Sequence, residues 1–220
     1  MTDLRERIIQ WQRGWGVARG LAPAEHLGAA LRVHCRQPAR EVEYFALEAG
    51  PALTGLAQRV AAEDAVTWLT VPTTDPDRDA AILQDAGLVL LRRSELMMTT
   101  DLRRHPQHAP AAAYRLESHL DSAVVTVTVR DAAGALGARG TMGLTGDIGV
   151  ADKIETLPEH RRRGLASELI SALARAAAAE GAEGGLLIAS EEGQHLYASL
   201  GWRPVAQVLI VTTPENADLA

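Results

Sequence analysis

The sequence predicts an α/β protein with two lobes. The order strand, helix, strand, helix, strand occurs once in each half of the chain, and a glycine, Gly87 or Gly201, follows the second helix of each copy, as is typical of a helix end. The segment at residues 105–111 contains two prolines and no periodic apolar face, so it indicates a linker. We therefore expect lobes at residues 1–104 and 112–220.

The first copy is outlined by alternating strand and helix patterns. Pro51 lies where a first-turn proline is tolerated, and Leu53, Leu56 and Val60 recur at helical spacing. The expected elements are a strand at Glu41–Glu48, a helix from Pro51 to Glu63, a strand at Val66–Val71, a helix from Asp75 to Ala86 and a long strand over Leu88–Leu91 and Leu96–Thr100.

The second copy follows a predicted β-hairpin. Val and Thr alternate over Ala123–Val129, a turn is expected at Asp131–Gly134, and Leu136–Leu144 returns as the second arm. The repeated order then predicts a strand at Ile148–Leu157, a helix at Leu165–Glu180, a strand at Leu186–Ala189, a short helix at Gly193–Leu200 and a strand at Val205–Thr212.

Composition and charge exclude several classes of protein. The hydrophobic fraction of 47% and charged fraction of 23% are typical of a globular chain, and the net charge of −6 argues against nonspecific binding to nucleic acid or anionic membranes. One cysteine, Cys35, permits no internal disulfide, and the first residues lack the apolar run of a secretory signal. We expect a cytoplasmic protein, monomeric or homodimeric.

The segment after the Ile148–Leu157 strand predicts an anion site. Three arginines, Arg161, Arg162 and Arg163, cross a short loop, and Gly164 precedes an amphipathic helix. First-turn amides have no partner inside the helix and carry the positive end of its dipole, so they can hold a phosphate. Arginine adds charge-assisted hydrogen bonds to phosphate oxygens. The plainer alternative is a solvated basic face.

Two motifs resemble the Gcn5-related N-acetyltransferase (GNAT) superfamily. Arg161, Gly164 and Ala166 match its acyl-CoA loop, Arg/Gln-x-x-Gly-x-Gly/Ala, and Leu196–Trp202 looks like its signature Leu-Tyr-x-x-x-Gly-Phe/Trp. The resemblance covers about Tyr114 to Thr213. It implies mixed, strongly twisted central sheets flanked by helices, in two GNAT-like lobes.

The resemblance implies a function and a cofactor site. It implies an N-acetyltransferase that moves an acetyl group from acetyl-CoA to a primary amine by direct attack in a ternary complex, with strand amides stabilising the oxyanion. Many members carry Asn where this chain has Ser190, which can still donate one hydrogen bond. The implied cofactor-binding residues are Ile154, Thr156, Arg161, Arg162, Arg163, Gly164, Leu165, Ala166, Ser167 and Ser190.

The catalytic residues are assigned with the same resemblance. Tyr197 is the expected general acid, because a phenol with a pKa near ~10 stays protonated at neutral pH; simple packing is its alternative role. Asp152 and Glu155 are three residues apart, so regular alternation would put them on opposite faces of a strand. We favour Glu155 as the base because it lies nearer the cofactor loop.

Other candidate sites are weaker. His105 and His108 have no third metal ligand near them in sequence, so we expect no metal site. Cys35 and His34 are adjacent, and adjacent strand residues point to opposite sides, so we expect an inert thiol. In the first lobe the junction at Leu47–Ala52 has no arginine, which favours a degenerate, non-catalytic copy.

The acceptor is left open. An antibiotic, a polyamine, an amino acid and a protein N-terminus all carry suitable amines. The alternative function is a non-catalytic acyl-CoA-binding or interaction protein with this fold. Aminoacyl transfer from tRNA is a third possibility, which the acidic net charge disfavours.

Overall fold

The computed structural model describes residues 3–108 and 113–219. The first half contains α1 (Leu4–Arg19), β1 (Glu25–His26), β2 (Ala30–Gln37), β3 (Arg40–Ala46), α2 (Ala52–Ala61), β4 (Thr67–Thr73), α3 (Pro76–Asp85), β5 (Val89–Asp101) and a 3-10 turn at Leu102–Arg104. The second half contains β6 (Tyr114–Asp121), β7 (Val124–Asp131), β8 (Leu136–Thr145), β9 (Ile148–Thr156), a 3-10 turn at Pro158–His160, α4 (Leu165–Ala179), β10 (Gly184–Ala189), α5 (Glu191–Ser199), β11 (Arg203–Thr212) and α6 (Pro214–Ala217).

All the predicted helices and strands are present, with ends that move by a few residues. The two segments expected around residues 88–100 form one continuous strand, β5. Five further elements, α1, β1, β2, β6 and α6, were not predicted.

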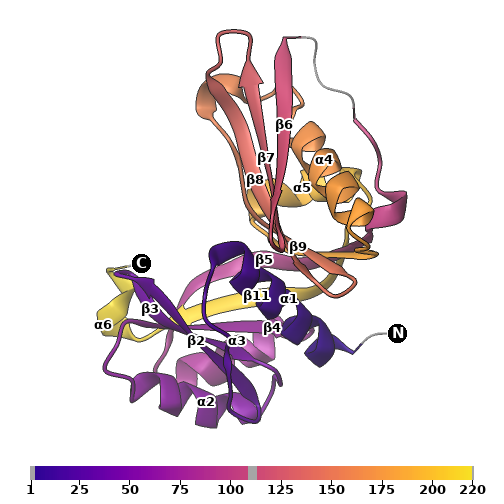
Figure 1. The fold of residues 1–220 in the computed structure, drawn as a ribbon. Coiled ribbons are helices and arrows are strands. Elements are labelled where there is room, and N and C mark those ends of the chain that lie inside the picture. The colour runs from indigo at the N-terminus through magenta and orange to yellow at the C-terminus, as the bar shows by residue number, and fades with distance from the viewer. Residues whose placement is uncertain (1–2, 109–112, 220) are drawn as a thin grey trace.

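The strands form one sheet of 11 strands in the order β1-β2-β3-β4-β11-β5-β10-β9-β8-β7-β6 (Figure 1). The expectation of a separate central sheet in each lobe is therefore wrong. The reason is an exchange of strands: β11 lies between β4 and β5, and β5 lies between β11 and β10. The final strand of each half thus pairs with the other half, and the ladder is continuous.

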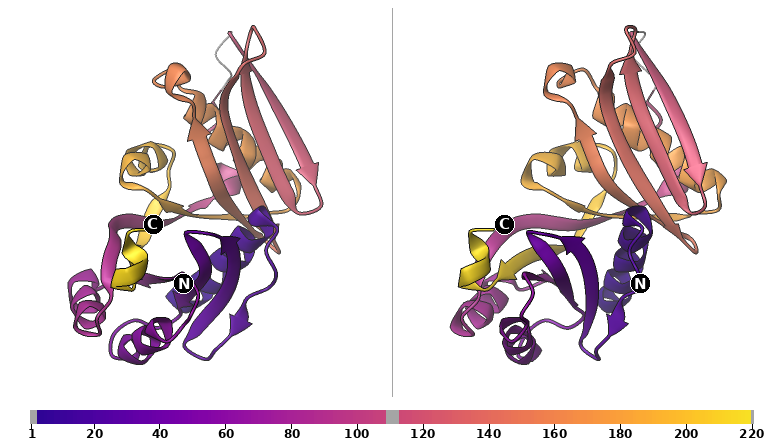
Figure 2. Two further views of the ribbon diagram at one scale, coloured as in Figure 1. Left: turned by 90° about the vertical axis from the view of Figure 1, so that its left-hand side faces the viewer. Right: turned by 60° about the vertical axis from the view of Figure 1, so that its left-hand side comes forward.

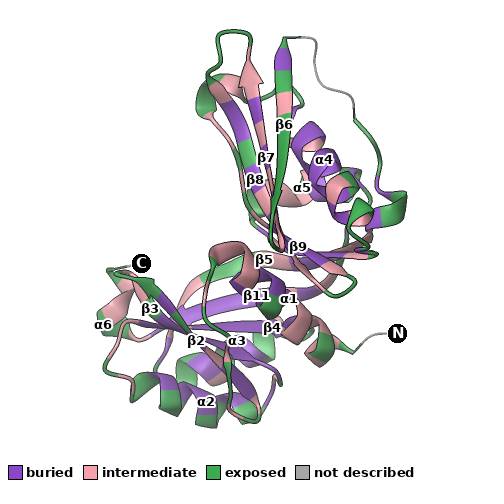
Figure 3. Cartoon of the chain, in the orientation of Figure 1, coloured by how far each residue is buried: buried purple, intermediate pink, exposed green. Residues whose placement is uncertain are grey.

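The helices cover the sheet from both faces. On one face, α2 and α3 pack on the first-half strands, with Tyr44 and Leu69 in their shared core, and α4 packs on β7, β8 and β9. On the opposite face α1 contacts β8, β9 and β10 and shares a core with residues of the first half, including Phe45. Figures 2 and 3 show α1 at the junction of the two parts and buried residues along the central strands.

α1 approaches the sheet closely enough to require glycine. A Cβ on Gly143 of β8 would lie 2.1 Å from the Gly14 carbonyl oxygen, and a Cβ on Gly14 would lie 2.3 Å from Val150 Cγ2. Trp11 and Trp15 stack on each other with ring centroids 5.7 Å apart. The first helix is therefore fixed against the second half of the sheet.

The predicted linker is partly ordered into the core. His105 is buried, and its Nε2 accepts a hydrogen bond of 3.2 Å from Trp202 Nε1. Residues 109–111 of the linker lie outside the described residues, and the division into two domains stays a prediction.

Within the described ranges no cluster of metal ligands occurs, and no helix there is long and apolar enough to cross a bilayer.

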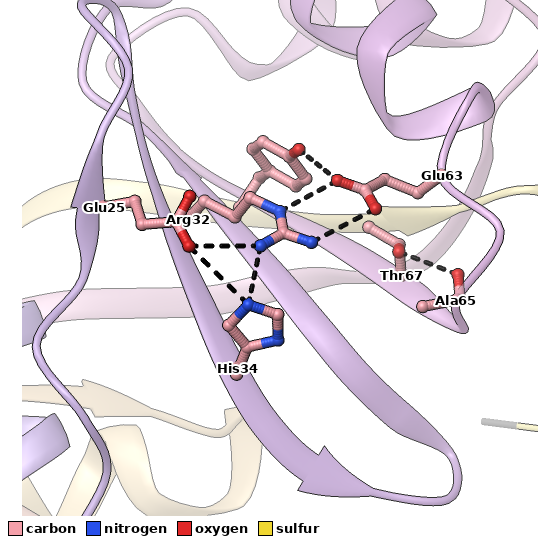
Figure 4. A network of polar contacts seen from close by, with 7 residues as sticks. Glu25, Arg32, His34, Glu63, Ala65 and Thr67 are labelled. Carbon is pink, nitrogen blue, oxygen red and sulfur yellow. Dashed lines mark hydrogen bonds and ion pairs between the residues drawn. The ribbon is translucent and has the colours of Figure 1, made fainter.

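A partly buried polar network ties elements of the first half together (Figure 4). Arg32 of β2 donates from Nε and Nη2 to the two carboxylate oxygens of Glu63, at 2.9 and 3.2 Å. The Tyr44 hydroxyl donates to the same carboxylate. The hydrogen bonds from Arg32, followed by that from Tyr44, lower the pKa of Glu63 below its ordinary value of 4.5. Glu63 lies just after α2, so the network ties that helix to β2 and β3.

Replacing Arg32 by methionine should lower the free energy of unfolding by about 2 kcal/mol at neutral pH, because a partly buried carboxylate loses its charged partner. Since the folded state lowers the pKa of Glu63, the network stabilises the fold above about pH 4.5 and loses its effect as the pH falls through the folded pKa. The difference in the free energy of unfolding between Arg32→Met and the parent protein should therefore become smaller in acid. Urea unfolding at several pH values measures it. Arg5→Met removes an exposed pair with Glu48 and should cost less than about 0.5 kcal/mol. A pH-independent difference would contradict the assignment.

Candidate functional site

A cleft opens where β9 and β10 separate. The two strands pair in parallel only over Ile148–Val150 and Gly184–Leu186. Beyond this point β9 continues to Thr156 against β8, while β10 continues to Ala189 against β5. The space between them is a cavity of about 650 Å³ bordered by β9, α4 and α5. One edge of β9 therefore presents its backbone to a cavity instead of to a neighbouring strand.

The N-terminus of α4 forms one wall of this cleft. Gly164 precedes the helix with φ 79°, a left-handed conformation that favours glycine. The first hydrogen bond of the helix runs from Glu168 N–H to the Gly164 carbonyl, at 3.2 Å, so the amides of residues 165–167 precede the internal ladder. Arg161 and Arg162 line the same wall. The wall combines peptide donors, a positive dipole end and two guanidinium groups.

Thr156 gives an independent sign of a missing polar partner. Its Oγ1 is buried and has no hydrogen-bond partner among the described residues, and Thr156 lines the cleft. Buried hydroxyls in folded proteins nearly always have a partner. A ligand with polar atoms along β9 would supply one.

Tyr197 of α5 forms the opposite wall. The residue is 8% exposed, and its ring packs edge-on against Trp202 with centroids 6.0 Å apart. A Cβ added at Gly193 would lie 3.0 Å from Tyr197 Cε2, so the glycine makes room for the ring. Burial, followed by the negative charge of Asp152, raises the pKa of Tyr197 to about 12. The phenol is therefore protonated at physiological pH.

Asp152 and Glu155 both border the cleft, which contradicts the expectation from regular alternation. The cause is a β-bulge: the register of β8 and β9 shifts between the Arg139–Glu155 and Thr141–Asp152 pairs, and Lys153 has φ 52°. Asp152 is 12% exposed at its side chain and accepts two hydrogen bonds from Arg19 of α1, at 2.8 and 3.0 Å. Glu155 is 46% exposed at its side chain and pairs with Arg139 at 2.8 Å.

Most of the residues expected to bind the cofactor meet at this cleft. Those that line it are Ile154, Thr156, Arg161, Arg162, Gly164, Leu165, Ala166, Ser167 and Ser190. Arg163 is different: its Nη1 donates to the Tyr114 hydroxyl oxygen at 2.9 Å, and it is not among the lining residues. Sequence reasoning also missed Glu95 of β5 and the Arg19–Asp152 pair, for which no local pattern exists.

The corresponding junction of the first half is filled by a side chain. Asp79 is fully buried, and its carboxylate accepts hydrogen bonds from Gly50 N–H at 3.0 Å, from Arg78 Nε at 2.8 Å and from the Thr73 hydroxyl at 2.5 Å. An internal carboxylate thus takes the position before α2.

The chain is similar to known proteins both over its whole fold and over the segment that forms the cleft. Residues 123–211 match the family model described as FR47-like protein, a segment that includes β8, β9, α4, β10 and α5. A GCN5-related N-acetyltransferase from Kribbella flavida is similar in structure, with TM-score 0.71, 17% identity and coverage of 97% of this chain and 96% of that chain. A search of curated proteins found no match.

Two further solved structures are similar over most of their length. A GNAT-family protein from Novosphingobium aromaticivorans has TM-score 0.61 and 19% identity, with coverage of 96% of this chain and 99% of that chain. A tandem GNAT protein from the clavulanic acid biosynthesis pathway has TM-score 0.59 and 12% identity, with coverage of 93% and 92%. At these identities the likeness establishes the architecture alone. The described chain has the α/β fold of the GNAT acetyltransferases, a mixed sheet flanked by helices.

Proposed function

We propose that the protein is an N-acetyltransferase that uses acetyl-CoA to acetylate a primary amine by direct attack in a ternary complex. The observation that carries the proposal is the cleft itself, in which the open edge of β9 runs from the N-terminus of α4 toward Tyr197. The fold supports acyl transfer as the reaction class.

The residues of the cleft fit the parts of acetyl-CoA. The amides at the start of α4, with Arg161 and Arg162, suit a diphosphate. The free edge of β9 suits the amide groups of a pantetheine arm, and Thr156 Oγ1 has no partner there among residues 3–108 and 113–219. When bound, acetyl-CoA supplies the acetyl group as a thioester.

Tyr197 is proposed to hold the proton that the leaving thiol receives. Its Oη is protonated because its pKa is raised to about 12, and the side chain lines the cleft opposite α4. A thiol of ordinary pKa, ~8.5, is more acidic than this phenol. Donation from Tyr197 therefore has to accompany departure of the thiolate, for which the tyrosine must be in contact with the sulfur.

Asp152 is proposed to take the proton of the attacking amine. Its side chain is more buried than that of Glu155, and its charge contributes to the raised pKa of Tyr197. Asp152 therefore lies nearer the proposed reaction centre. Glu155, the base favoured from the sequence, also borders the cleft and stays the second candidate.

The strand order supports duplication as the origin of the chain. The parallel pairs β3–β4 and β9–β10 flank the exchanged strands β11 and β5. In the order β3-β4-β11-β5-β10-β9, each strand of the first half thus has a counterpart from the second half at the mirrored position. Together with the carboxylate of Asp79 before α2, it supports a tandem protein whose first copy is degenerate.

Acetyl-CoA should stabilise the protein by about 2.7 kcal/mol at a hundredfold excess over its dissociation constant. Arg162→Glu should remove most of this gain, because Arg162 lines the cleft and the new charge repels phosphate. Arg163→Glu is the matched control: that side chain binds Tyr114, so more of the gain should survive. Thermal unfolding of each variant with and without acetyl-CoA measures the effect. Absence of any gain in the parent protein would refute the cofactor site.

Tyr197→Phe should lower turnover roughly a hundredfold with little change in acetyl-CoA affinity, measured as CoA thiol release over a panel of amines. Because the pKa of Tyr197 is raised to about 12, deprotonation of the phenol should not reduce the rate at mildly alkaline pH. Tyr44→Phe removes a phenol in the first-half network and should leave turnover unchanged. Saturable acetyl-CoA binding without turnover for any amine would favour the acyl-CoA-binding alternative instead.

A further inference from the structure

A second cavity, of about 340 Å³, lies beside the cleft. Four residues line both cavities, namely Glu95, Ala151, Asp152 and Ile188. The remainder of its wall comes from α1, from the end of β2 and the loop after it, and from β3, β4, β5 and β11. The second cavity therefore adjoins the proposed reaction centre and is built largely by the first half of the chain.

Three buried hydrogen-bond donors of residues that line this cavity have no partner within the part of the chain that the structure describes. Trp11 and Trp68 line it, and the Nε1 atoms of both are buried without a hydrogen-bond acceptor among the described residues. Arg40 also lines the cavity, and its Nε is likewise buried without an acceptor among the described residues. An unpaired buried donor costs about 1–3 kcal/mol, and three of them around one cavity indicate a ligand group that accepts hydrogen bonds.

Arg40 is held in a fixed position at this end of the cavity. Its Nη1 lies 3.0 Å from Glu43 Oε2, and its Nη2 donates to Gln37 Oε1 at 3.3 Å. The guanidinium carbon lies 4.9 Å from the centroid of the Trp68 ring and 5.7 Å from that of Trp15. The free Nε is thus a pre-organised, charged donor.

The charges of the wall balance. Three arginines and three acids line the cavity, in the pairs Arg19–Asp152, Arg40–Glu43 and Arg92–Glu95. Two of the acids, Asp152 and Glu95, are at the side shared with the cleft. The third, Glu43, is paired with Arg40 and also accepts a hydrogen bond from the Thr70 hydroxyl at 2.7 Å; burial raises its pKa.

We propose that the second cavity binds the acceptor and that this acceptor is a small amine carrying a carboxylate, with the chemistry of a free amino acid. Its ammonium group would lie at Asp152 and Glu95, toward the cleft, and its carboxylate at the donors of Trp11, Trp68 and Arg40. The assignment of this molecule as an acceptor rests on the proposed acetyl transfer. The binding preference itself does not.

The same wall disfavours the other acceptor classes. A polyamine or an aminoglycoside carries several positive charges and needs an excess of carboxylates, whereas three arginines offset the three acids here. A zwitterion has no net charge and can pair with both ends of the cavity.

Calorimetric titration of the full-length protein tests the preference. The probes are the twenty free amino acids, the amide of each, in which a carboxamide replaces the carboxylate, and spermidine. At least one amino acid should bind saturably and roughly tenfold or more tightly than its own amide, as expected for a hydrogen-bonded charge. If no amino acid binds better than its amide, or if spermidine binds better than all of them, the proposal is overturned.

Two variants locate the binding. Trp68→Phe and Trp11→Phe each keep an aromatic ring and remove an unpaired Nε1 donor, and each should reduce the ratio of acid to amide affinity about fivefold. Tyr44→Phe is the control, because it removes a polar atom of the first-half network and Tyr44 is not among the residues that line this cavity; the ratio should be preserved. Unchanged ratios in both donor variants, with circular dichroism as for the parent, would overturn the site.

A failure of this inference can be told apart from a failure of the proposed acetyl transfer. Stabilisation by acetyl-CoA and the effect of Tyr197→Phe are measured on the same preparations. Turnover of an amine without a preference for carboxylates would refute this inference and leave acetyl transfer standing. A carboxylate preference without any acetyl-CoA effect would support the cavity and refute the transferase.

Discussion

The separation of β9 from β10 is the constraint on which the site depends. Backbone polar groups in a sheet are normally paired, yet the ladder between these strands stops after three residue pairs. Beyond Val150, β9 continues against β8 and contains the bulge at Lys153, while β10 stays attached to β5. This divergence creates the cavity, exposes an edge of β9 to it and brings Asp152 to its border. The loop after β9 then carries the start of α4 to the same opening.

The first half of the chain is part of this site and cannot be regarded as an appendage. α1 contacts β8 through Gly14 and Gly143, and its last residue, Arg19, holds Asp152. The exchange of β11 and β5 makes the halves share one ladder. Loss of the first half would therefore remove the partner of Asp152 and most of the wall of the second cavity. It would also leave one face of the second-half strands without α1.

The sequence predicted what depends on local patterns and missed what depends on distant contacts. Gly164 and Tyr197 were recognisable because each lies in a local sequence motif; the φ of 79° that the structure gives Gly164 favours glycine there. The helix α1 escaped notice because Gly14 and Gly16 lower its helix propensity; their place against the sheet is a tertiary fact. The Arg19–Asp152 pair joins residues 133 positions apart. The bulge at Lys153 likewise has no periodic signal, so alternation placed Asp152 incorrectly.

Asp152 links the two proton transfers of the proposed reaction. Its negative charge contributes to the raised pKa of Tyr197, which keeps the phenol protonated while an ammonium or amine occupies the site. When the carboxylate accepts a proton from the attacking nitrogen, that charge disappears, and the pKa of Tyr197 falls by the part that Asp152 supplied. The phenol thus becomes a stronger acid at the moment at which the leaving sulfur requires a proton. Arg19 fixes the position of this carboxylate, because it donates two hydrogen bonds to it, at 2.8 and 3.0 Å.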